Sequence, residues 1–182
     1  MTFSPDEYWP AMGQYLAGPG AATPEHREAE GLLSEILPKL GLIDDVLDVG
    51  CGRGRLASLL LDVLPSVKYS GVDIGPAQVA ATSKVRPDGE VFLSRIQDFA
   101  PDRQWDLVIA SEVLMHIPPA DIAETCLRVK DLARKWLVTI DWTTPLDQPI
   151  DQCNWLHPYP DLLGPAAQVI PTGLQTISVF RR

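Results

Sequence analysis

The feature that most constrains this chain is a glycine-rich turn directly after a short apolar segment. Residues 46–49 are apolar except for Asp48, and glycine then occupies every second position over residues 50–54. Glycine is used where a chain turns sharply after a strand and lets a ligand approach its backbone. Residues 55–61 have helical composition and contain no helix breaker. The turn therefore joins a strand to a helix, which is typical of a cofactor cradle.

Two kinds of cofactor-binding domain use such a turn, and the glycine spacing separates them. A dinucleotide fingerprint reads G-x-G-x-x-G, but Arg55 holds the position of its final glycine here. Residues 46–54 resemble instead the first motif of class I S-adenosylmethionine-dependent methyltransferases, an apolar pair followed by an acid, any residue and G-x-G-x-G. A nicotinamide-dependent oxidoreductase on a similar sheet is the less favoured alternative among enzymes.

A second marker is Asp73, which ends a predicted strand about twenty residues beyond the turn. A carboxylate at this strand end accepts hydrogen bonds from both ribose hydroxyls in nucleoside-binding folds of either kind, so Asp73 does not separate the two cofactors. An ordinary aspartate that caps the helix from Pro76 is the alternative. The resemblance implies that Ile74 packs against the adenine ring.

The third marker is an aspartate followed by an aromatic residue after the third strand. In the methyltransferase family an acid in this region commonly accepts a hydrogen bond from the adenine amino group, and the backbone amide of the next residue serves a ring nitrogen. The resemblance assigns these roles to Asp98 and Phe99. A surface-turn aspartate is the alternative.

The fourth marker, residues 105–118, resembles the segment around strand four of small-molecule methyltransferases, where a buried strand ends in Ser or Asn before Val-Leu, His and Pro. The segment lacks the Pro-Pro-aromatic element of nucleic-acid amino-methyltransferases and the Pro-Cys pair of cytosine C5 enzymes. The cofactor-binding residues that the resemblance implies are Asp48, Gly50, Cys51, Gly52, Gly54, Asp73, Ile74, Asp98, Phe99 and Ser111.

Three residues are candidates for a general base: His116, Asp141 and His157. Histidine suits proton removal near neutral pH, although many family members carry a histidine at the position of His116 for structural reasons. Asp141 lies at the carboxyl end of the predicted fifth strand, on the ligand side of such a sheet. The histidines are scattered without ligand spacing, so no metal site is expected.

Substrate contacts are expected from the two ends of the chain. Residues 1–22 resemble the N-terminal caps that close over the site in several family members and exclude water; an aromatic staple for the first helix is the alternative. Residues 141–165 form a long predicted loop in which polar and aromatic groups alternate, as suits either a small-molecule pocket or a simple cover for the sheet. The expected substrate-binding residues are Tyr8, Trp9, Tyr15, Trp142, Asn154, Trp155 and Tyr159.

Length, charge and cysteine content narrow the class of protein. The 182 residues suit one domain, residues 23–182, behind the N-terminal segment. A net charge of −9 disfavours nucleic acid and membrane surfaces as partners. Three cysteines, no secretory signal and no membrane span predict a cytoplasmic protein. The sequence does not indicate an oligomeric state.

Apolar runs alternate with helical stretches, which predicts an α/β fold with a parallel sheet covered on both faces. The resemblance makes this a Rossmann-like, doubly wound, seven-stranded and mostly parallel sheet whose last strand is antiparallel. The expected strands are 45–49, 68–72, 90–94, 105–110, 136–140, 168–170 and 174–180, and the expected helices are 24–40, 54–63, 76–84 and 119–132, with a short helical turn at 160–163.

The sequence thus predicts an S-adenosylmethionine-dependent methyltransferase that acts on an O, N or S atom of a small molecule. Two alternatives stay open. One is an S-adenosylmethionine-binding partner or degenerate subunit without methyl transfer, motivated by the short and irregular C-terminal region. The other is an enzyme that uses the same cofactor for a non-methylating reaction such as cyclisation.

Overall fold

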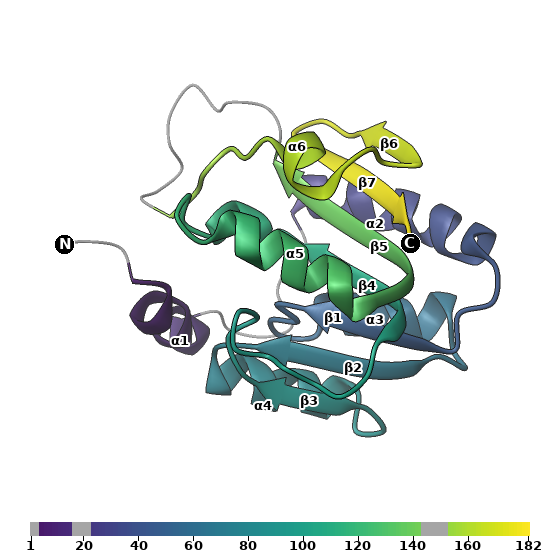
Figure 1. Ribbon diagram of the computed structural model, residues 1–182. Helices are drawn as coiled ribbons and strands as arrows, with labels where there is room; N and C mark the ends of the chain where they lie inside the picture. Colours follow the sequence, from purple (N-terminus) through teal and green to yellow (C-terminus); the bar gives the residue numbers. More distant parts are fainter. Residues whose placement is uncertain (1–3, 16–22, 143–152) are drawn as a thin grey trace.

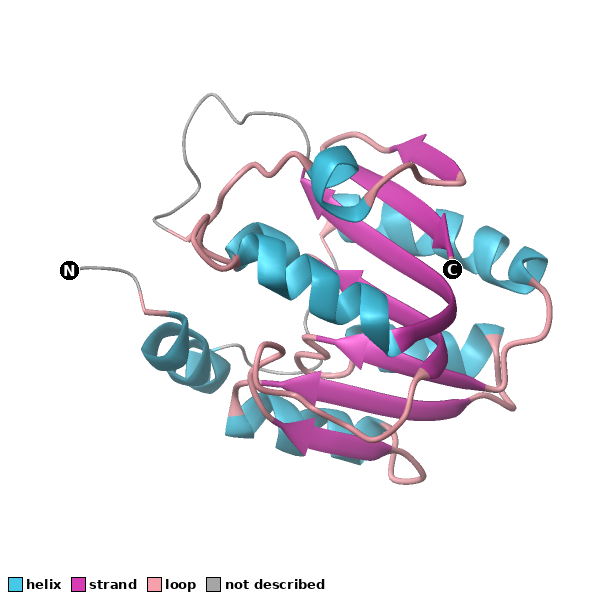
Figure 2. Ribbon diagram, in the orientation of Figure 1, coloured by secondary structure: helices cyan, strands magenta, loops and turns pink. Residues whose placement is uncertain are grey.

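The computed structural model describes residues 4–15, 23–142 and 153–182. Within these ranges seven strands form one sheet in the order β3-β2-β1-β4-β5-β7-β6, with helices on both faces (Figures 1 and 2). Strands β1 to β5 pair in parallel, and β7 is antiparallel to both β5 and β6. The doubly wound α/β fold that the sequence predicts is confirmed, including the direction of its last strand.

The elements follow the expected order. The helices are α1 (Pro5–Tyr15), α2 (Pro24–Ile36), α3 (Arg55–Val63), α4 (Pro76–Val85), α5 (Ile122–Leu132) and α6 (Tyr159–Leu163), with 3₁₀ turns η1 (Leu37–Leu40) and η2 (Leu114–His116). The strands are β1 (Asp45–Val49), β2 (Lys68–Asp73), β3 (Glu90–Leu93), β4 (Trp105–Ser111), β5 (Ala133–Trp142), β6 (Gln168–Pro171) and β7 (Gln175–Arg181). Helix α1 is not among the expected helices, α5 begins at Ile122 rather than at residue 119, and most other ends lie within two residues of the prediction.

Two further differences from the sequence prediction have identifiable reasons. Helix α2 ends at Ile36 and continues as the 3₁₀ turn η1, because Pro38 has no backbone N–H and its ring clashes with an α-helical carbonyl four residues earlier. Strand β5 begins at Ala133, three residues before the expected Trp136, directly after α5. Ala133 is buried and pairs with Trp105 at the start of β4, so sheet pairing extends the strand.

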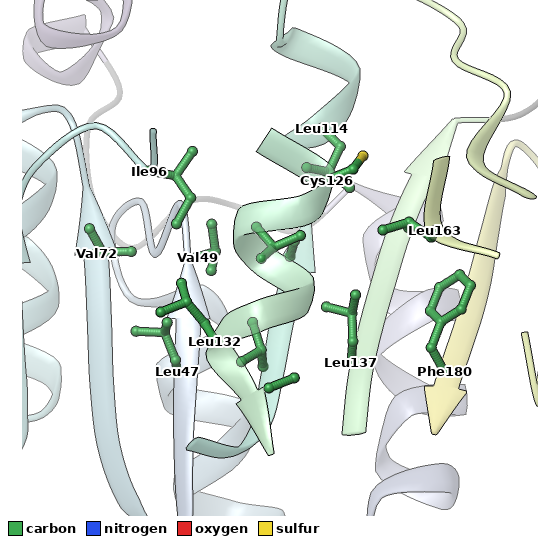
Figure 3. Close-up of a cluster of buried hydrophobic side chains, with 14 of the residues drawn as sticks. Leu47, Val49, Val72, Ile96, Leu114, Cys126, Leu132, Leu137, Leu163 and Phe180 are labelled. Atoms are coloured by element: carbon green, nitrogen blue, oxygen red, sulfur yellow. The ribbon is translucent and has the colours of Figure 1, made fainter. Parts of the chain in front are cut away.

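The sheet separates two apolar layers. On one face, residues such as Leu47, Val49 and Leu137 pack against α5 and α6 (Figure 3). On the other, alternate positions of the same strands pack against α2 and α3. Because successive side chains of a strand point to opposite faces, strands covered on both sides read as continuous apolar runs. Strand β4 shows this most clearly, since its first six residues are all buried.

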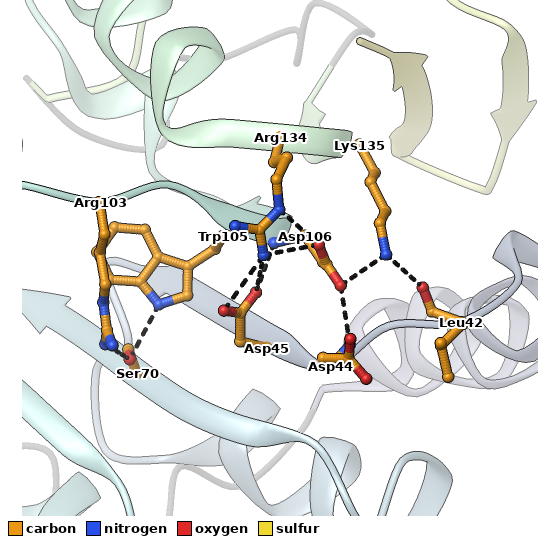
Figure 4. A network of polar contacts seen from close by, with 9 residues as sticks. All are labelled: Leu42, Asp44, Asp45, Ser70, Arg103, Trp105, Asp106, Arg134 and Lys135. Atoms are coloured by element: carbon orange, nitrogen blue, oxygen red, sulfur yellow. Dashed lines mark hydrogen bonds and ion pairs between the residues drawn. The ribbon is translucent and has the colours of Figure 1, made fainter.

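An ion-pair network fixes the amino ends of the central strands (Figure 4). The buried Asp106 carboxylate accepts hydrogen bonds from Asp44 N (3.0 Å), Arg134 Nε (2.8 Å) and Lys135 Nζ (2.8 Å). Burial raises the pKa of Asp106, but these donors more than offset it and hold the pKa at about 2. The network joins β1, β4 and β5 at the edge of the sheet opposite to the glycine-rich loop.

The network makes folding stability depend on pH. A folded pKa of about 2 lies below the ordinary value of 3.8, so the Asp106 contribution is present above pH 4 and is lost as the pH falls towards 2. Because Arg134 and Lys135 are nearly half exposed, screening reduces this contribution to about 1 kcal/mol. We expect Asp106→Asn to lower the free energy of unfolding by that amount at pH 7 in urea titrations.

The matched control for this measurement is Asp131→Asn, because Asp131 is exposed and pairs with Arg182 at 3.5 Å on the surface. Its free energy of unfolding should change by less than about 0.5 kcal/mol. Equal losses in the two variants would contradict a special role for Asp106.

Candidate cofactor and active site

A cavity of about 720 Å³ lies at the carboxyl ends of the parallel strands. Its described walls include the loops after β1, β2, β3 and β4 and residues of helix α1. Figure 1 shows α1 on the side of the sheet toward which the arrows of β2 and β3 point. Strand β1 has β2 on one side and β4 on the other, so the chain connections leave this point in opposite directions. In open α/β sheets a ligand crevice forms at such a reversal of strand order.

The glycine-rich loop is shaped by close contacts that require glycine. Gly50 has a φ of +66°, and a Cβ on it would lie 2.3 Å from Val113 Cγ2. Gly52 has a φ of +54°, and the atom nearest to a Cβ at this position would be the Gly50 carbonyl oxygen at 3.9 Å, so the position faces the open cavity. Gly54 has a φ of +84° and begins α3 without lining the cavity. Gly50, Cys51 and Gly52 therefore form the floor.

Asp73 at the end of β2 ties the loop to the next strand. Its carboxylate accepts hydrogen bonds from Gly52 N (2.9 Å) and Gly75 N (2.8 Å). Burial raises the pKa of Asp73 and the two amide bonds lower it, with a net upward shift. Ile74 lines the cavity beside it, and so does Ser111 at the end of β4. The structure thus brings most of the expected cofactor-binding residues together.

Asp98 and Phe99 are exceptions, because neither residue lines the cavity in the described structure. The wall after β3 consists of residues 94–97, whereas the Asp98 side chain is 71% exposed and lies 3.9 Å from Arg95 Nε. A tight turn, with Asp98 N donating to Arg95 O at 3.2 Å, carries Asp98 away from the cavity. Phe99 is buried in the core, where its ring packs against Phe92 and Trp105. Ile96 and Gln97 occupy the wall instead.

Glu112 anchors the opposite wall. It has a φ of +56°, a left-handed conformation that costs a non-glycine residue about 1 kcal/mol. Its carboxylate accepts hydrogen bonds from His26 Nε2 (2.6 Å), Trp142 Nε1 (3.2 Å) and Gln175 Nε2, and Arg55 lies at 3.5 Å. Burial raises the pKa of Glu112, but these donors outweigh it and lower the pKa overall. Four elements therefore converge on one carboxylate.

Sequence reasoning missed this convergence and three basic side chains of the cavity wall, Arg53, Arg55 and His26. Arg53 and Arg55 directly follow glycines of the loop, which is a signal that the sequence did contain. His26 has no such signal: its Nδ1 accepts a hydrogen bond from Thr23 N (3.1 Å) at the start of α2, and only the packing of α2 brings its Nε2 to Glu112. All three residues line the cavity.

Of the three candidate bases, His116 lines the cavity. It ends the turn η2, and its Nδ1 lies 3.1 Å from the Cys153 carbonyl. A carbonyl only accepts, so Nδ1 carries the proton and the lone pair of the neutral ring is on Nε2. The Trp9 ring packs against the imidazole, with 4.5 Å between ring centroids.

Asp141 and His157 do not line the described cavity. Both contact the segment that contains the turn η2. Asp141 is buried and accepts a hydrogen bond from Met115 N (3.2 Å), and burial holds its pKa well above the ordinary value. His157 Nε2 donates to the Ile117 carbonyl (2.9 Å), and burial lowers the pKa of His157. Both residues support the turn that carries His116, and neither reaches the space where a substrate could bind.

Some of the expected substrate-binding residues line the cavity and others do not. Tyr8, Trp9, Trp142 and Asn154 line the cavity. Trp155 does not line it, and its backbone N–H donates to the Met115 carbonyl (2.8 Å). Tyr159 is buried in the core under α5. Tyr15 ends α1, but its side chain lies outside the described part, as do residues 143–152 of the long loop.

No three or more His, Cys, Asp or Glu side chains among the described residues are grouped so as to hold a metal ion. No helix in this part of the chain has the length and apolarity to cross a membrane.

Comparison with known proteins agrees with this architecture. A family model described as a methyltransferase domain matches residues 47–135. A magnesium protoporphyrin IX methyltransferase from Synechocystis, crystallised with S-adenosylhomocysteine, superposes with a TM-score of 0.78 at 18% identity over 97% of each chain. An N-methyltransferase from Bradyrhizobium japonicum, in complex with the same molecule, gives 0.77 at 14% identity over 97% of this chain and 99% of that one.

The fold, the glycine-rich loop and the matched methyltransferase domain together support a class I S-adenosylmethionine-dependent methyltransferase. Among curated relatives the chain is similar to a trans-aconitate 2-methyltransferase from Escherichia coli, at 28% identity over 70% of this chain and 52% of the relative. The corresponding enzyme of an Enterobacter species is 32% identical over 47% of this chain and 34% of its own length. The chain thus spans about half the length of the first of these relatives.

Proposed function

We propose that this protein binds S-adenosylmethionine in the cavity and transfers its methyl group to an O, N or S atom of a small molecule. The observation that carries the proposal is the glycine floor joined to Asp73. A side chain on Gly52 would point into the cavity, where a glycine leaves room for a ligand. A volume of about 720 Å³ is within the range of small-molecule sites. These residues therefore fit the cofactor.

The chain's own residues would hold the cofactor at three points. Asp73 would accept hydrogen bonds from the ribose hydroxyls. Ile74, as the resemblance implies, and Ile96 would contact the adenine ring. Asp48 and Ser111 would contact the amino-acid portion. When bound, the cofactor supplies a sulfonium methyl carbon that accepts an electron pair from a nucleophile as its bond to sulfur breaks.

His116 would act at the acceptor end of the cavity. Its Nε2 carries the lone pair, so it would take the proton from a hydroxyl, amine or thiol as that atom becomes the nucleophile. A carboxylate acceptor is already ionised and would need no such base. Trp9, Trp142 and Asn154 would orient the acceptor, because each lines this part of the described site.

The choice of acceptors to test follows the named relatives. The similar Escherichia coli protein is called a trans-aconitate 2-methyltransferase, so a panel would start from tricarboxylic acids and extend to phenols, amines and thiols. Cofactor binding without methyl transfer across that panel would support the alternative of a non-catalytic cofactor-binding subunit. A cytoplasmic location stays a prediction from the sequence.

The cofactor proposal predicts saturable binding of S-adenosylhomocysteine in calorimetry. We expect Asp73→Asn to weaken this binding by about 10- to 100-fold, because an amide replaces a charged acceptor of hydroxyl hydrogen bonds. The matched control is Asp98→Asn, whose side chain points to solvent and should leave affinity within about twofold. The reverse ranking would restore the family-based assignment of Asp98 and overturn the adenine wall proposed here.

The base proposal predicts a difference between two histidines on the same turn. With an acceptor that must lose a proton, His116→Asn should lower kcat by about 10²- to 10⁴-fold and leave cofactor affinity nearly unchanged. His157→Asn should lower kcat by less than about fivefold, because His157 supports the turn from outside the cavity. If the kcat of His116→Asn were close to that of the wild type, His116 would not be the general base.

Helix α1, within the described part of residues 1–22, is proposed to act as a lid over the cavity. Three contacts support this proposal: Arg95 Nη1 donates to Asp6 Oδ2 (3.2 Å), Gln78 Nε2 donates to Trp9 O (2.7 Å), and the Trp9 ring packs on His116. We expect S-adenosylhomocysteine to slow hydrogen exchange of the α1 amides by about tenfold or more, with α5 amides as the internal reference. Unchanged exchange in α1 would argue for a fixed aromatic cover instead.

A further inference from the structure

Tyr69 of strand β2 forms a hydrogen bond with Asp48 of the neighbouring strand β1, whose carboxylate is part of the cavity wall. In the parallel pairing of β1 with β2, Asp48 lies opposite Gly71, and Tyr69 is two residues before Gly71 on the same face of β2. Tyr69 Oη donates a hydrogen bond to Asp48 Oδ2 at 2.8 Å. Tyr69 and Asp48 are 3% and 2% exposed, so water does not compete for this bond.

Gly71 makes the contact possible. A Cβ at this position would lie 2.9 Å from the Tyr69 hydroxyl and 3.1 Å from Cys51 Sγ. Any side chain opposite Asp48 would therefore displace the tyrosine. The position of the Tyr69 ring is also fixed by Arg86, because the Arg86 guanidinium lies over the ring, 5.0 Å from its centroid. The hydroxyl is thus fixed in a single place under the glycine-rich loop.

Asp48 also differs from the other carboxylates of the cavity. Asp73 accepts two loop amides, and Glu112 is surrounded by His26, Arg55, Trp142 and Gln175. Asp48 has Tyr69 as its hydrogen-bond partner among the described residues. It is therefore the carboxylate that is best able to accept a further, positively charged group from a ligand.

We propose that Tyr69 is a positioning residue for cofactor binding, whose hydroxyl orients the Asp48 carboxylate for the ammonium group of S-adenosylmethionine. This inference rests on the proposed function. The tyrosine would not touch the cofactor and would act only through Asp48. None of the sequence motifs pointed to Tyr69, because its role comes from the register of β1 and β2 and from the missing side chain of Gly71.

The surroundings of Asp48 make its charge sensitive to this one hydrogen bond. Burial raises the pKa of Asp48 to about 7, while the Tyr69 hydroxyl and the Arg55 guanidinium lower it and Asp73 raises it. Cys51 beside it stays protonated, because burial raises the pKa of that thiol far above its ordinary value. A cationic ligand binds the ionised form, so affinity should rise as the pH rises through 7 and then level off.

The test is calorimetric binding of S-adenosylhomocysteine to the full chain between pH 6 and 8.5, with wild type and Tyr69→Phe. Wild-type affinity should rise about tenfold between pH 6 and 8. Loss of the hydroxyl should raise the pKa of Asp48 by about one unit, so Tyr69→Phe should bind about fivefold more weakly at pH 7 and within about twofold at pH 8.5. A deficit that is constant with pH, or no deficit, would overturn the inference.

Tyr159→Phe is the matched control, since it removes a buried tyrosine hydroxyl outside the cavity and should leave the pH profile unchanged. A second variant, Asp48→Asn, tests the inference even if Tyr69→Phe does not fold. We expect Asp48→Asn to bind S-adenosylhomocysteine weakly and with an affinity that does not change with pH. An affinity that still changes with pH in this variant would overturn the inference.

A carboxyl ¹³C titration of the unliganded protein separates this inference from the proposed function. The Asp48 midpoint should rise in Tyr69→Phe whether or not the ligand binds, and an unchanged midpoint would count against Tyr69. If wild type binds no S-adenosylhomocysteine at all, the proposed function fails and the role of Tyr69 in cofactor binding fails with it. Normal wild-type binding with an unaltered pH profile in Tyr69→Phe would reject the role of Tyr69 alone.

Discussion

The pairing of β1 with β2 on one side and β4 on the other is the constraint from which the site follows. Connections that leave β1 and β4 in opposite directions cannot close over the gap between them, so the strand ends stay accessible. The chain fills this gap with backbone rather than side chains, because Gly50 packs against Val113 too closely for a Cβ. The Asp106 ion pairs hold the opposite ends of the same strands.

Glu112 connects the cavity to the rest of the molecule. Its left-handed backbone turns the chain sharply after β4, and its carboxylate is held by donors from α2, β5 and β7, with Arg55 of α3 close by. Ion pairs in which one partner is buried are costly to break, since the remaining charge loses its compensation. The wall near the glycine-rich loop is therefore held by several charged and polar contacts to Glu112, whereas the α1 side is joined to the domain by a few polar and aromatic contacts.

Local patterns predicted the parts of the site that lie on strands. The glycine spacing, Asp73 and Ser111 are fixed by where a strand ends, and a strand end can be read from apolar periodicity. The position of Asp98 could not be predicted in this way, because it follows a turn rather than a strand, and in the described structure that turn directs its side chain away from the cavity. The same limit applies to Trp155 and Tyr159, which contact the turn and the core instead of the cavity.

The sequence by itself determined the class of fold and the position of the cofactor cradle, because both depend on residues close together in the chain. The tertiary structure decided which of His116, Asp141 and His157 faces the cavity, and it alone brought His26 to Glu112 and Tyr69 to Asp48. These pairs are 86 and 21 residues apart in sequence. Burial and hydrogen bonding between such distant residues arise only when the sheet register and helix packing are complete.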